Sequence, residues 1–575
     1  MRKLLTFVAG TLITGSMFAG GLVTNTNQSA AWVRLPSRNA SVGIDAVYYN
    51  PAGLMKLENG FHLSLSNQSV FQTREIDNTY AGPATATSPN GGYGLNNHVY
   101  KGTVTALAFP SIYAAYKMDK FAISLGFNPI GGGGGAEYKT GLPSFEMSPS
   151  DLVPTLASQG AVGYRLDTYF KGSSTFLGYQ AGVSYKVNDL ISVAVGLRYV
   201  TAKNTYNGYL KDIQLDMGGG TWVPATTVLQ GLATKLISIT TIPTALAPAI
   251  TGGLGGQNLT VAASLSPAIA AAKSNIEAGL AAIGVPAATI AVMPLSTISA
   301  TITGATPTLM DQAASASANS TLVADQSADV AQTGSGISPI FSVNISPSEN
   351  LNIAIKYEMM TKLELTNKTV QDLTVGYESM NGSVLVPQSK IPDMTKPINM
   401  FPNGEKTRND MPAMLAVGID YKVAQNFKIS LGSNYFFDKN ADYGHKVDDD
   451  LNSSTPTVHI ANKYIIFDNG YSVQGGLEYK ISERLLVSGG YVWANRGVNP
   501  KYQSDLTYGL ATQTFGIGGA YSFTDKIQLN IGYGYTAYQT DSKYIDHVNG
   551  KTLYNPLETY KKSTTIFGIG LDMRF

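Results

Sequence analysis

The chain ends in Thr565-Ile566-Phe567-Gly568-Ile569-Gly570-Leu571-Asp572-Met573-Arg574-Phe575, a stretch in which two kinds of side chain alternate. From Thr565 onward, every second residue is threonine or a large apolar residue, and the series ends on the aromatic ring of Phe575. The residues between them are mostly glycine or charged. Because successive side chains of a β-strand point to opposite faces, this stretch predicts a strand with one face suited to hydrocarbon and one small, polar face.

The same alternation recurs upstream in runs about as long as a tilted strand needs to cross a bilayer. These runs lie at residues 527–536, 427–437, 351–359, 191–199 and 121–127. No run after the amino terminus has about 18 consecutive apolar residues, so a membrane protein of this sequence must cross the membrane with strands.

The connections between these runs also alternate, because very short polar turns are separated by much longer segments. The short turns lie at residues 117–120, 187–189, 347–350, 424–426, 482–484 and 524–526. Tyrosines precede five of them, namely Tyr116, Tyr185, Tyr421, Tyr479 and Tyr521. Short turns at one end, long loops at the other and an aromatic girdle are typical of a transmembrane barrel, and we assign the turns to the periplasmic side.

Counting these hairpins with a first strand at 61–74 and a last strand from 562 gives about fourteen strands. The predicted fold class is therefore all-β, a transmembrane antiparallel barrel over residues 61–575. An eight-stranded barrel is filled by its own side chains, whereas a barrel of this size has a lumen that must hold water or a plug.

The first residues predict export. Arg2 and Lys3 precede an apolar stretch at 4–18 that is too short to span a bilayer, which is typical of a signal peptide at 1–19. Cleavage is expected just after Ala19 or Gly21. An amino-terminal anchor helix is the alternative, and the short run disfavours it. The absence of cysteine suits an oxidising, extracytoplasmic compartment.

Residues 20–60 contain no long alternating run and end in the turn-rich stretch Tyr48-Tyr49-Asn50-Pro51-Ala52-Gly53-Leu54. A segment of this size at the periplasmic mouth is expected to fold inward as a hatch. With Asp45 and the paired tyrosines before it and the first strand after it, this stretch resembles the FadL type of outer-membrane transporters. That family carries long-chain fatty acids or aromatic hydrocarbons, and the shared barrel plan covers nearly the whole mature chain.

The resemblance implies a fourteen-stranded barrel whose lumen is blocked by the hatch. It also implies that Asn50, Pro51, Ala52 and Gly53 pack against the inner wall near the ligand route. The chain departs from the family, whose members commonly have small residues and glycine in this region, at four positions: Trp32, Arg34, Arg38 and Asn39. These departures indicate a divergent branch.

The third predicted strand is interrupted after residue 127 by Asn128-Pro129-Ile130 and then by five glycines, Gly131 to Gly135. Proline cannot donate a hydrogen bond to a sheet, and glycine marks bulges and bends. One interpretation is a loop that begins at Gly131, and the other is a kink that opens the barrel sideways. The resemblance favours a kink with a lateral gap at Pro129, Gly131, Gly132 and Gly133, because ligand is thought to leave FadL-type proteins at their third strand.

Residues 209–335 form an insertion rich in Ala, Thr, Ser and Ile that should have structure of its own. Ser266 and Pro267 predict a helix start, and an apolar stripe then runs to Gly284. A second helix is expected near Val228 and Leu236. The resemblance implies that such helices dock hydrophobic ligand, through Ile269, Ile276 and Leu280. A lid of helices packed only on each other is the alternative.

No catalytic or metal-binding pattern accompanies these features. The five histidines, His62, His98, His445, His459 and His547, lack metal-ligand spacing or a Ser/Asp partner pattern. Asp448-Asp449-Asp450 lacks calcium-loop spacing, and we interpret it as a solvated loop. We therefore expect neither an enzyme nor a bound cofactor. A net charge of +1 gives no electrostatic reason for a nucleic-acid partner.

These patterns predict a monomeric outer-membrane channel for passive uptake of hydrophobic molecules with lateral exit into the membrane. Its expected partners are the hydrophobic ligand, outer-membrane lipid and the barrel-assembly machinery, which would recognise Phe575. Two alternatives remain: a general diffusion porin, and a surface adhesin or receptor that uses the 209–335 insertion.

Overall fold

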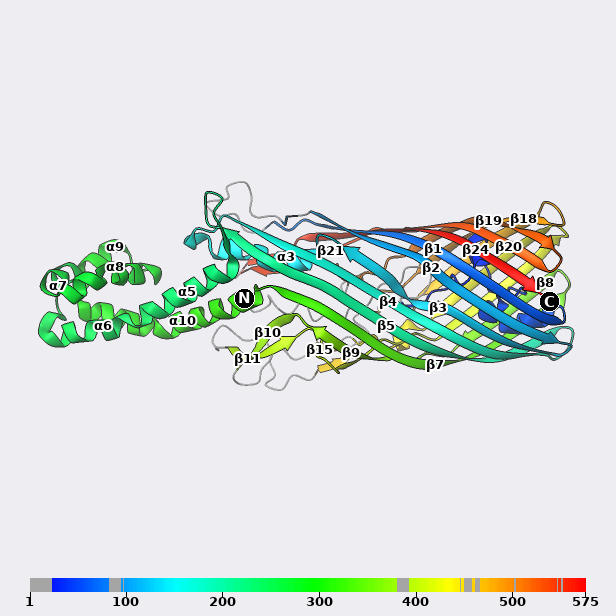
Figure 1. The fold of residues 1–575 in the computed structure, drawn as a ribbon, viewed down its shortest axis with the longest axis horizontal. Helices are drawn as coiled ribbons and strands as arrows, with labels where there is room; N and C mark the ends of the chain where they lie inside the picture. Colours follow the sequence, from blue (N-terminus) through cyan, green and yellow to red (C-terminus); the bar gives the residue numbers. More distant parts are fainter. Residues whose placement is uncertain are drawn as a thin grey trace.

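The computed structural model describes residues 23–81, 95–96, 98–379, 392–444, 446–448, 458–460, 466–500, 503–545, 547–549 and 552–575. The expected signal peptide lies outside these residues, as do Asp449, Asp450 and His445. Figure 1 shows a long barrel with a hatch inside one end and a helical arm beyond the other.

Fourteen antiparallel strands close on themselves, as the sequence predicts. The ring is completed where the last strand pairs with the first, from His62 opposite Arg574 to Asn78 opposite Glu558. In order around the barrel, the strands are β1 (Gly60–Asn78), β2 (Val99–Met118), β3 (Phe121–Tyr138), β4 (Gly163–Lys186), β5 (Ile191–Asp216), β7 (Gln326–Ser348), β8 (Leu351–Glu358), β13 (Met414–Ala424), β14 (Phe427–Phe436), β17 (Tyr471–Lys480), β18 (Leu485–Asn495), β19 (Thr512–Thr524), β20 (Ile527–Tyr538) and β24 (Leu557–Arg574).

The outer surface of this barrel is apolar. Large aliphatic side chains are more than half exposed on strands all around it, among them Leu125, Val195, Leu431, Val473, Ile517, Ile531 and Ile569. The tyrosines beside the short turns are also exposed: Tyr116, Tyr185, Tyr421, Tyr479 and Tyr521. A belt of this kind is stable only against lipid, so the barrel spans a membrane with strands.

The strands differ in length, and several run well past the membrane at the long-loop end. β4, β5 and β7 have 24, 26 and 23 residues, whereas about ten suffice to cross a bilayer. Short strands extend this part of the wall or pair beside it: β6 (Trp222–Pro224), β9 (Glu364–Gln371), β10 (Thr374–Ser379), β11 (Pro392–Asn399), β12 (Lys406–Arg408), β15 (Lys446–Asp448), β16 (Val458–Ile460), β21 (Asp541–Tyr544), β22 (His547–Asn549) and β23 (Thr552–Tyr554).

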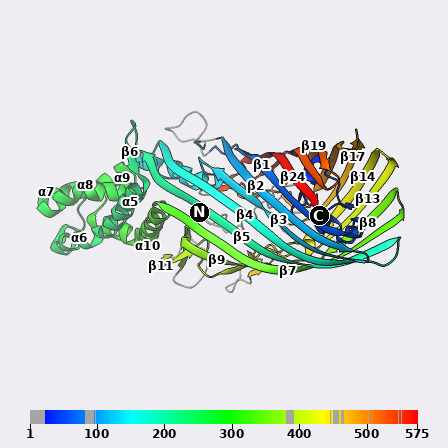
Figure 2. The same cartoon turned by 45° about the vertical axis from the view of Figure 1, so that its right-hand side comes forward.

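The predicted insertion is helical only in its central part. β5 and β7 remain paired as far as Leu210 opposite Gln326, so the expected boundaries at 209 and 335 fall within strands. The helices form an arm that projects from the barrel (Figures 1 and 2). They are α5 (Ala225–Thr240), α6 (Ile242–Ala249), the π-helical turn η3 (Ile250–Leu254), α7 (Leu259–Leu265), α8 (Pro267–Ala282), α9 (Ala287–Val292) and α10 (Leu295–Leu322). The predicted cap of α8 is present, because the Ser266 hydroxyl accepts a hydrogen bond from the Ile269 amide.

The hatch lies inside the barrel at the short-turn end, shown in dark blue in Figure 2. Its elements are α1 (Ala30–Arg34), α2 (Ala46–Tyr49) and the 3-10 helix η1 (Pro51–Lys56). At the long-loop end, short helices line the mouth: α3 (Pro143–Ser150), α4 (Leu152–Thr155), η2 (Ala157–Gln159) and η4 (Asp438–Asn440).

The hatch explains why the inner face of the wall is rich in glycine. A Cβ atom on Gly532 would lie 2.7 Å from the backbone nitrogen of Arg34, and one on Gly568 would lie 2.9 Å from a methyl carbon of Val33. Real side chains do not approach this closely, so these wall positions must lack a side chain for α1 to fit. The alternating glycines of the last strands are therefore contact positions for the hatch.

Candidate functional site

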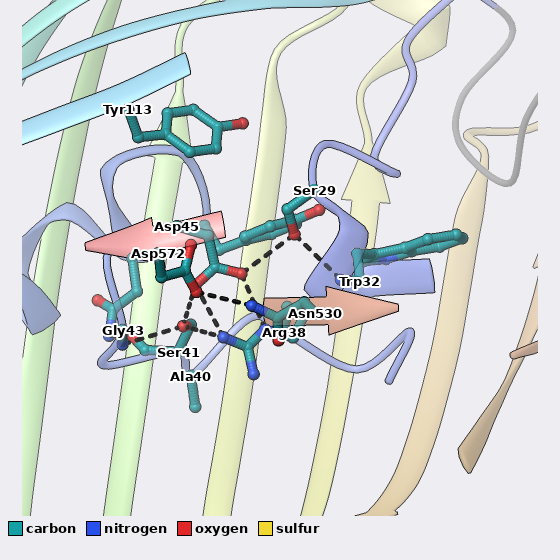
Figure 3. Close-up of polar contacts among 12 residues, drawn as sticks. Ser29, Trp32, Arg38, Ala40, Ser41, Gly43, Asp45, Tyr113, Asn530 and Asp572 are labelled. Carbon is teal, nitrogen blue, oxygen red and sulfur yellow. Dashed lines mark hydrogen bonds and ion pairs between the residues drawn. The ribbon is translucent and has the colours of Figure 1, made fainter. Parts of the chain in front are cut away.

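The hatch is folded around a buried ion pair (Figure 3). Arg38 donates to both oxygens of Asp45, at 2.9 and 2.7 Å. The hydroxyls of Ser41 and Ser29 donate to the same carboxylate, at 2.6 and 3.2 Å. A bidentate guanidinium contact with further donors fixes the geometry of both groups. The sequence indicated Asp45 as part of the family-like stretch but gave no partner for it.

This ion pair makes the hatch sensitive to acid. Burial raises the pKa of Asp45, but the charge and hydrogen bonds of Arg38 and the hydroxyl donors outweigh burial, so the pKa lies below its ordinary value. A carboxylate with a depressed pKa contributes stability that is complete above its unfolded pKa, about 3.9, and is lost as the pH falls through its folded pKa. The Arg38–Asp45 pair therefore holds the hatch together down to about pH 4.

We expect the packing around Trp32 to be constant from about pH 8 to 4 and to loosen at lower pH. The measurement is the fluorescence of Trp32, which is buried, after the other two tryptophans, Trp222 and Trp493, are replaced by phenylalanine. In the same background, Asp45→Asn should give a shallower acid profile, with the hatch destabilised at neutral pH by about 3 kcal/mol because Arg38 then lacks its buried counter-charge. Matching acid profiles for the two chains would contradict this assignment.

Three of the four predicted hatch-contact residues, Asn50, Pro51 and Ala52, contact the inner wall, whereas Gly53 packs within the hatch. Asn50 donates to Asn344 on β7 at 2.7 Å and to the Ser41 carbonyl at 3.1 Å. The carbonyls of the next two residues each accept one hydroxyl from the wall, with Ser184 bound to Pro51 at 2.7 Å and Ser192 bound to Ala52 at 2.8 Å. At Gly53, a Cβ atom would lie 2.4 Å from the Asn50 amide nitrogen and 2.7 Å from the Ser41 carbonyl oxygen.

Charged groups inside the barrel also contact the hatch. On β8, Lys356 donates to the Tyr48 carbonyl and to Glu358, both at 2.7 Å. Arg198 on β5 makes two hydrogen bonds to Glu358, at 2.6 and 3.1 Å. All three charged side chains are buried, and both cations lie over the Tyr48 ring.

The residues that depart from the family pattern provide further anchors. Arg34 forms an ion pair of 2.6 Å with Glu478 on β17 and also donates to Asn530 on β20 at 3.0 Å. The Asn39 amide donates to the Val417 carbonyl at 3.1 Å. These side chains therefore join the hatch to the wall on the side opposite the third strand.

The wall is interrupted between β2 and β3. From Phe121 to Phe127, β3 pairs with β2, and pairing resumes only where Glu137 and Tyr138 meet Thr103 and Gly102. Residues 104–111 of β2 and 128–136 of β3 are not paired with each other, although β3 remains on β4. Because β3 continues to Tyr138, the structure has a break in one seam and not a loop that starts at Gly131.

The break begins at the height of the lipid and continues toward the long loops. It begins seven paired residues from the short turn, and at about 3.3 Å per residue and a tilt of about 40° this is about 18 Å above the turn. The apolar band of such barrels is about 25 Å tall, so the break begins in its half nearer the long loops. On the outer side of the break, Leu107 is 65% exposed.

The amino-terminal part of the hatch, residues 23–28, closes the break from inside. Thr24 forms an antiparallel bridge with Gly131. Asn25 donates its amide to the Ile130 carbonyl at 2.8 Å, and Gly132 donates its amide to the Val23 carbonyl at 3.0 Å. We call residues 23–28 the gate segment.

Glycine is required at Gly131 and Gly132 for different reasons. A Cβ atom on Gly131 would lie 2.5 Å from the Val23 carbonyl, so the close approach of the gate segment excludes a side chain. Gly132 has φ of 91°, a conformation that L side chains rarely adopt. Pro129 contributes its carbonyl to the gate segment. Gly133, the next predicted gap residue, also lies within β3.

Gln28 holds the gate segment in place. Its side-chain amide donates to the Pro129 carbonyl at 2.9 Å and to the Asn25 carbonyl at 3.0 Å, and its side-chain oxygen accepts from Asn128 at 2.7 Å. Its backbone carbonyl accepts from the Tyr113 hydroxyl at 2.7 Å. All of these atoms are buried.

The paired tyrosines connect the gate segment to the body of the hatch. The Tyr48 hydroxyl donates to the Asn25 carbonyl at 3.0 Å. The Tyr49 hydroxyl donates to the Thr26 carbonyl at 2.9 Å and accepts the Gln28 amide at 2.7 Å. The two predicted sites, the Asn50 stretch and the Pro129 break, are thus joined by two residues that the sequence had already placed beside Asn50.

The predicted ligand-docking residues lie elsewhere. Ile269, Ile276 and Leu280 are buried in a hydrophobic core that the helices of the arm form among themselves. The helix that carries them, α8, packs against α5, α6, α7 and α9, so these side chains do not form an open surface. The arrangement is that of helices packed on each other, and Ile269 and its neighbours hold the arm together.

Histidines and acidic residues do not assemble into a metal site in the part of the chain that the structure describes. His547 contacts Asp151 at 2.7 Å, a pair brought together from segments about four hundred positions apart. No spacing in the sequence signals such a contact, because the two residues lie on different loops of the long-loop end.

Comparison with known proteins gives a structural match without a sequence match. No protein-family model matches the chain, and no curated protein matches it. A crystal structure of a Pseudomonas aeruginosa FadL homologue aligns with 97% of this chain and 100% of its own, at 11% identity and a TM-score of 0.54.

Two toluene transporters also align over most of their length. TodX from Pseudomonas putida covers 93% of this chain and 94% of its own, at 12% identity and a TM-score of 0.45. TbuX from Ralstonia pickettii covers 100% of both chains at 15% identity and a TM-score of 0.44. Of these three structures, the FadL homologue has a TM-score above 0.5 and the two toluene transporters do not. The chain therefore has the fold of that FadL homologue, a closed fourteen-stranded barrel, as the FadL-type resemblance in its sequence predicts.

Proposed function

We propose that this protein lies in a bacterial outer membrane and lets hydrophobic molecules pass through it without coupling to an energy source. The molecule enters from the long-loop end, which we assign to the cell exterior, and leaves sideways into the membrane between β2 and β3. The short turns then face the periplasm, where the hatch closes the lumen.

The observation that carries this proposal is the break between β2 and β3, which begins at lipid height and is closed from inside by the gate segment. A barrel without a transport role should not retain an unpaired seam, because each backbone group that faces lipid without a partner costs several kcal/mol. Here the carbonyl of Ile130 and the amide of Gly132 take partners from the gate segment. Withdrawal of the segment would open a lateral path.

The contacts indicate which part of the hatch moves. The body is held by buried ion pairs, such as Arg34 with Glu478 and the Lys356–Glu358 pair that holds Tyr48. The gate segment is held by neutral hydrogen bonds worth about 1 kcal/mol each. A hydrophobic ligand that competes for the break can displace the segment while the body stays in place.

Substitution at Gly131 tests this proposal. In Gly131→Ala the new methyl group would lie 2.5 Å from the Val23 carbonyl and should displace the gate segment. Loss of two or three hydrogen bonds of about 1 kcal/mol each shifts the closed–open equilibrium at least tenfold toward the open state. We expect faster uptake of labelled oleate or toluene by cells that carry this variant.

The matched control is Gly135→Ala, in the same run of glycines. A Cβ atom there meets only Ser173 and Gly172, at 3.5 and 3.7 Å, which is ordinary van der Waals contact. Its uptake should equal that of the wild type. Equal uptake by Gly131→Ala and wild type, with both chains folded, would overturn the role of the gate segment.

The arm supports a second candidate, a surface receptor or adhesin. It extends beyond the barrel and has its own hydrophobic core, so it can present a surface to a partner without any transport (Figure 1). Uptake separates the two candidates, since a receptor has no need of it. A general porin is separated by single-channel conductance, because a large, steadily open pore is incompatible with a hatch that fills the lumen.

A further inference from the structure

The outer surface of β4 and β5 changes character along these two strands, which continue well past the lipid toward the arm (Figure 1). As far as Tyr179 and Tyr199, the outward side chains are apolar. From the opposed pair Thr175 and Lys203 onward, they are polar, charged or tyrosine. Thr175 lies ten residues from Tyr185 at the short turn. At about 3.3 Å per residue and a tilt of about 40°, this is about 25 Å, the height of the apolar band.

Two tyrosine rings form an aromatic platform on the outward face above the lipid. Tyr169 on β4 is directly opposite Tyr209 on β5, and their rings are stacked, with centroids 5.6 Å apart and planes 20° from parallel. The Tyr169 hydroxyl donates to Glu137 at 3.0 Å, and the Tyr209 hydroxyl is hydrogen-bonded to Asp167. Both rings are therefore held in place while remaining partly exposed. Such rings offer a flat π-surface to the C–H face of a sugar ring.

Two exposed lysines lie between this platform and the lipid. Lys203 on β5 lies in the first polar row, and Lys171 on β4 lies in the row next to the tyrosine pair. Within the described residues, neither lysine forms an ion pair. Glu137 is opposite Lys171 but accepts the Tyr169 hydroxyl, and the carboxylate of Asp329 accepts the Asn207 amide at 2.9 Å. The neighbouring carboxylates are thus engaged by neutral donors, and both ammonium groups are available to an external anion.

The order of these groups along the wall matches one kind of molecule. With increasing distance from the lipid come the ammonium of Lys203, the paired hydroxyls of Ser173 and Thr205 at 2.6 Å, the ammonium of Lys171 and then the tyrosine platform. At the same rise per residue, the platform lies about 15 Å above Lys203. A lipid whose head group has phosphates at the membrane surface and sugars beyond them presents its groups in this order. A soluble partner has no reason to begin its contacts at the edge of the lipid.

We propose that the outward face of β4 and β5 above the lipid binds the phosphorylated saccharide head group of a glycolipid in the outer leaflet. Lys203 and Lys171 bind its phosphates, and Tyr169 and Tyr209 pack against one of its sugar rings. We call these four residues the glycolipid face. The inference rests on the proposed location in an outer membrane with the long-loop end outward. It does not depend on transport, because the face lies on the outside of the wall, away from the hatch.

The test measures the affinity of the purified full-length barrel for rough lipopolysaccharide, a membrane glycolipid with phosphorylated sugars. Wild type is compared with Lys171→Gln/Lys203→Gln. The matched control is Lys120→Gln/Lys422→Gln, which removes two exposed lysines at the short-turn end. Each chain is also titrated with the same glycolipid after its phosphates are removed and with its water-soluble oligosaccharide. These ligands separate the contributions of the phosphates, the sugars and the lipid.

We expect Lys171→Gln/Lys203→Gln to bind the phosphorylated glycolipid at least tenfold more weakly, because each cation near an anionic lipid surface adds several-fold to the affinity. The dephosphorylated glycolipid should bind equally to this variant and to wild type, and the control pair should behave like wild type. All four lysines are exposed and lack a partner in the fold, so the variants should unfold at the wild-type temperature.

The tyrosine platform has its own test. Tyr169→Leu/Tyr209→Leu keeps an apolar surface but removes both flat rings, so it should weaken binding of the phosphorylated and the dephosphorylated glycolipid by the same factor. Tyr185→Leu, the same change at the short-turn end of β4, should leave both affinities unchanged. Cross-strand aromatic pairs also stabilise a sheet, so the affinities are measured well below the unfolding temperature of each variant.

Unchanged affinity in Lys171→Gln/Lys203→Gln overturns the inference. Equally tight binding of the water-soluble oligosaccharide also overturns it, because the ligand would then not be a membrane lipid. Uptake distinguishes this result from the transport proposal. If Gly131→Ala speeds uptake but the lysine variant keeps its full affinity, only the glycolipid face is misassigned. If glycolipid binding depends on the lysines but Gly131→Ala leaves uptake unchanged, the role of the gate segment fails and the glycolipid face stands.

Discussion

Gln28→Ala should leave the barrel folded but should open the lateral break between β2 and β3. The substitution removes three side-chain hydrogen bonds and leaves the Pro129 carbonyl and the Asn128 amide buried without this partner. At about 1 to 3 kcal/mol for each of these two unsatisfied groups, closure of the gate segment should weaken by about 2 to 6 kcal/mol. This is the largest effect expected on transport.

The readouts are uptake of labelled hydrophobic ligand and hydrogen exchange of the gate segment. Uptake should rise, and amides such as that of Asn25 should lose protection, while the strands remain protected. Gln214→Ala is the matched control, because Gln214 accepts two hydrogen bonds from Arg165 at an exposed site on β5. A gate segment that stays protected in Gln28→Ala would contradict the role assigned to this residue.

Glu358→Gln should have the largest effect on stability. The substitution leaves Arg198 and Lys356 buried without their shared counter-charge, and breaking one partner of a buried pair destabilises by about 3 to 5 kcal/mol. Because Lys356 also holds the Tyr48 carbonyl, the hatch should loosen with it. The midpoint of unfolding, followed by the heat-dependent shift of the barrel on a gel, measures the effect.

Glu364→Gln is the control for this loss of one carboxylate. Glu364 pairs with Lys406 at 2.7 Å, but both side chains are more than half exposed. Surface pairs contribute about 0 to 1 kcal/mol, so this variant should unfold like the wild type. Equal midpoints for the two glutamate variants would show that the inner network does not support the barrel.

The wall could be predicted from sequence because its rules are local. A period of two, short turns and tyrosines beside them are all visible within ten residues, and they led to the correct strand number. The start of α8 at Ser266 and Pro267 was visible for the same reason. The limits of the arm were placed too far out, since β5 and β7 lose their outward apolar residues once they leave the membrane but remain paired.

The gate segment could not be predicted, because it has no pattern of its own. Residues 23–28 are mostly small and polar and find their partners at Ile130 and Gly132, about one hundred positions later. The sequence indicated that the wall fails near Pro129. It did not indicate which segment covers this break, since a single bridge and the contacts of Gln28 create no periodicity.

The sequence contained a signal for the charged wall residues that contact the hatch. Lys356 and Glu358 are two residues apart in a predicted strand, so they share a face, and a membrane strand can bear charge only on its inner face. Arg198 has the same placement on its strand. Charged residues at inward positions therefore identify the wall positions that hold a plug or a ligand.

The predicted docking residues of the arm show that a sequence pattern can predict burial without identifying the partner. Ile269, Ile276 and Leu280 form a stripe at helical spacing, and such a stripe predicts that one face is covered without indicating by what. The structure shows that other helices of the arm cover it.

The central claim is that the gate segment must leave the break for transport to occur. Asn27 in the gate segment donates to Gln68 on β1 at 3.1 Å, and the chain has no cysteine. In Asn27→Cys/Gln68→Cys, a short reducible thiol cross-linker therefore joins only these two positions. Asn59→Cys/Asp119→Cys, at an exposed contact of 2.8 Å near the short turns, is the matched control.

The measurement is uptake of labelled hydrophobic ligand by the double-cysteine barrel before cross-linking, after it and after reduction. Our account predicts that cross-linking Asn27→Cys/Gln68→Cys abolishes uptake and that reduction restores it, while the Asn59→Cys/Asp119→Cys barrel transports throughout. Undiminished uptake with the gate segment cross-linked to β1 would contradict the account.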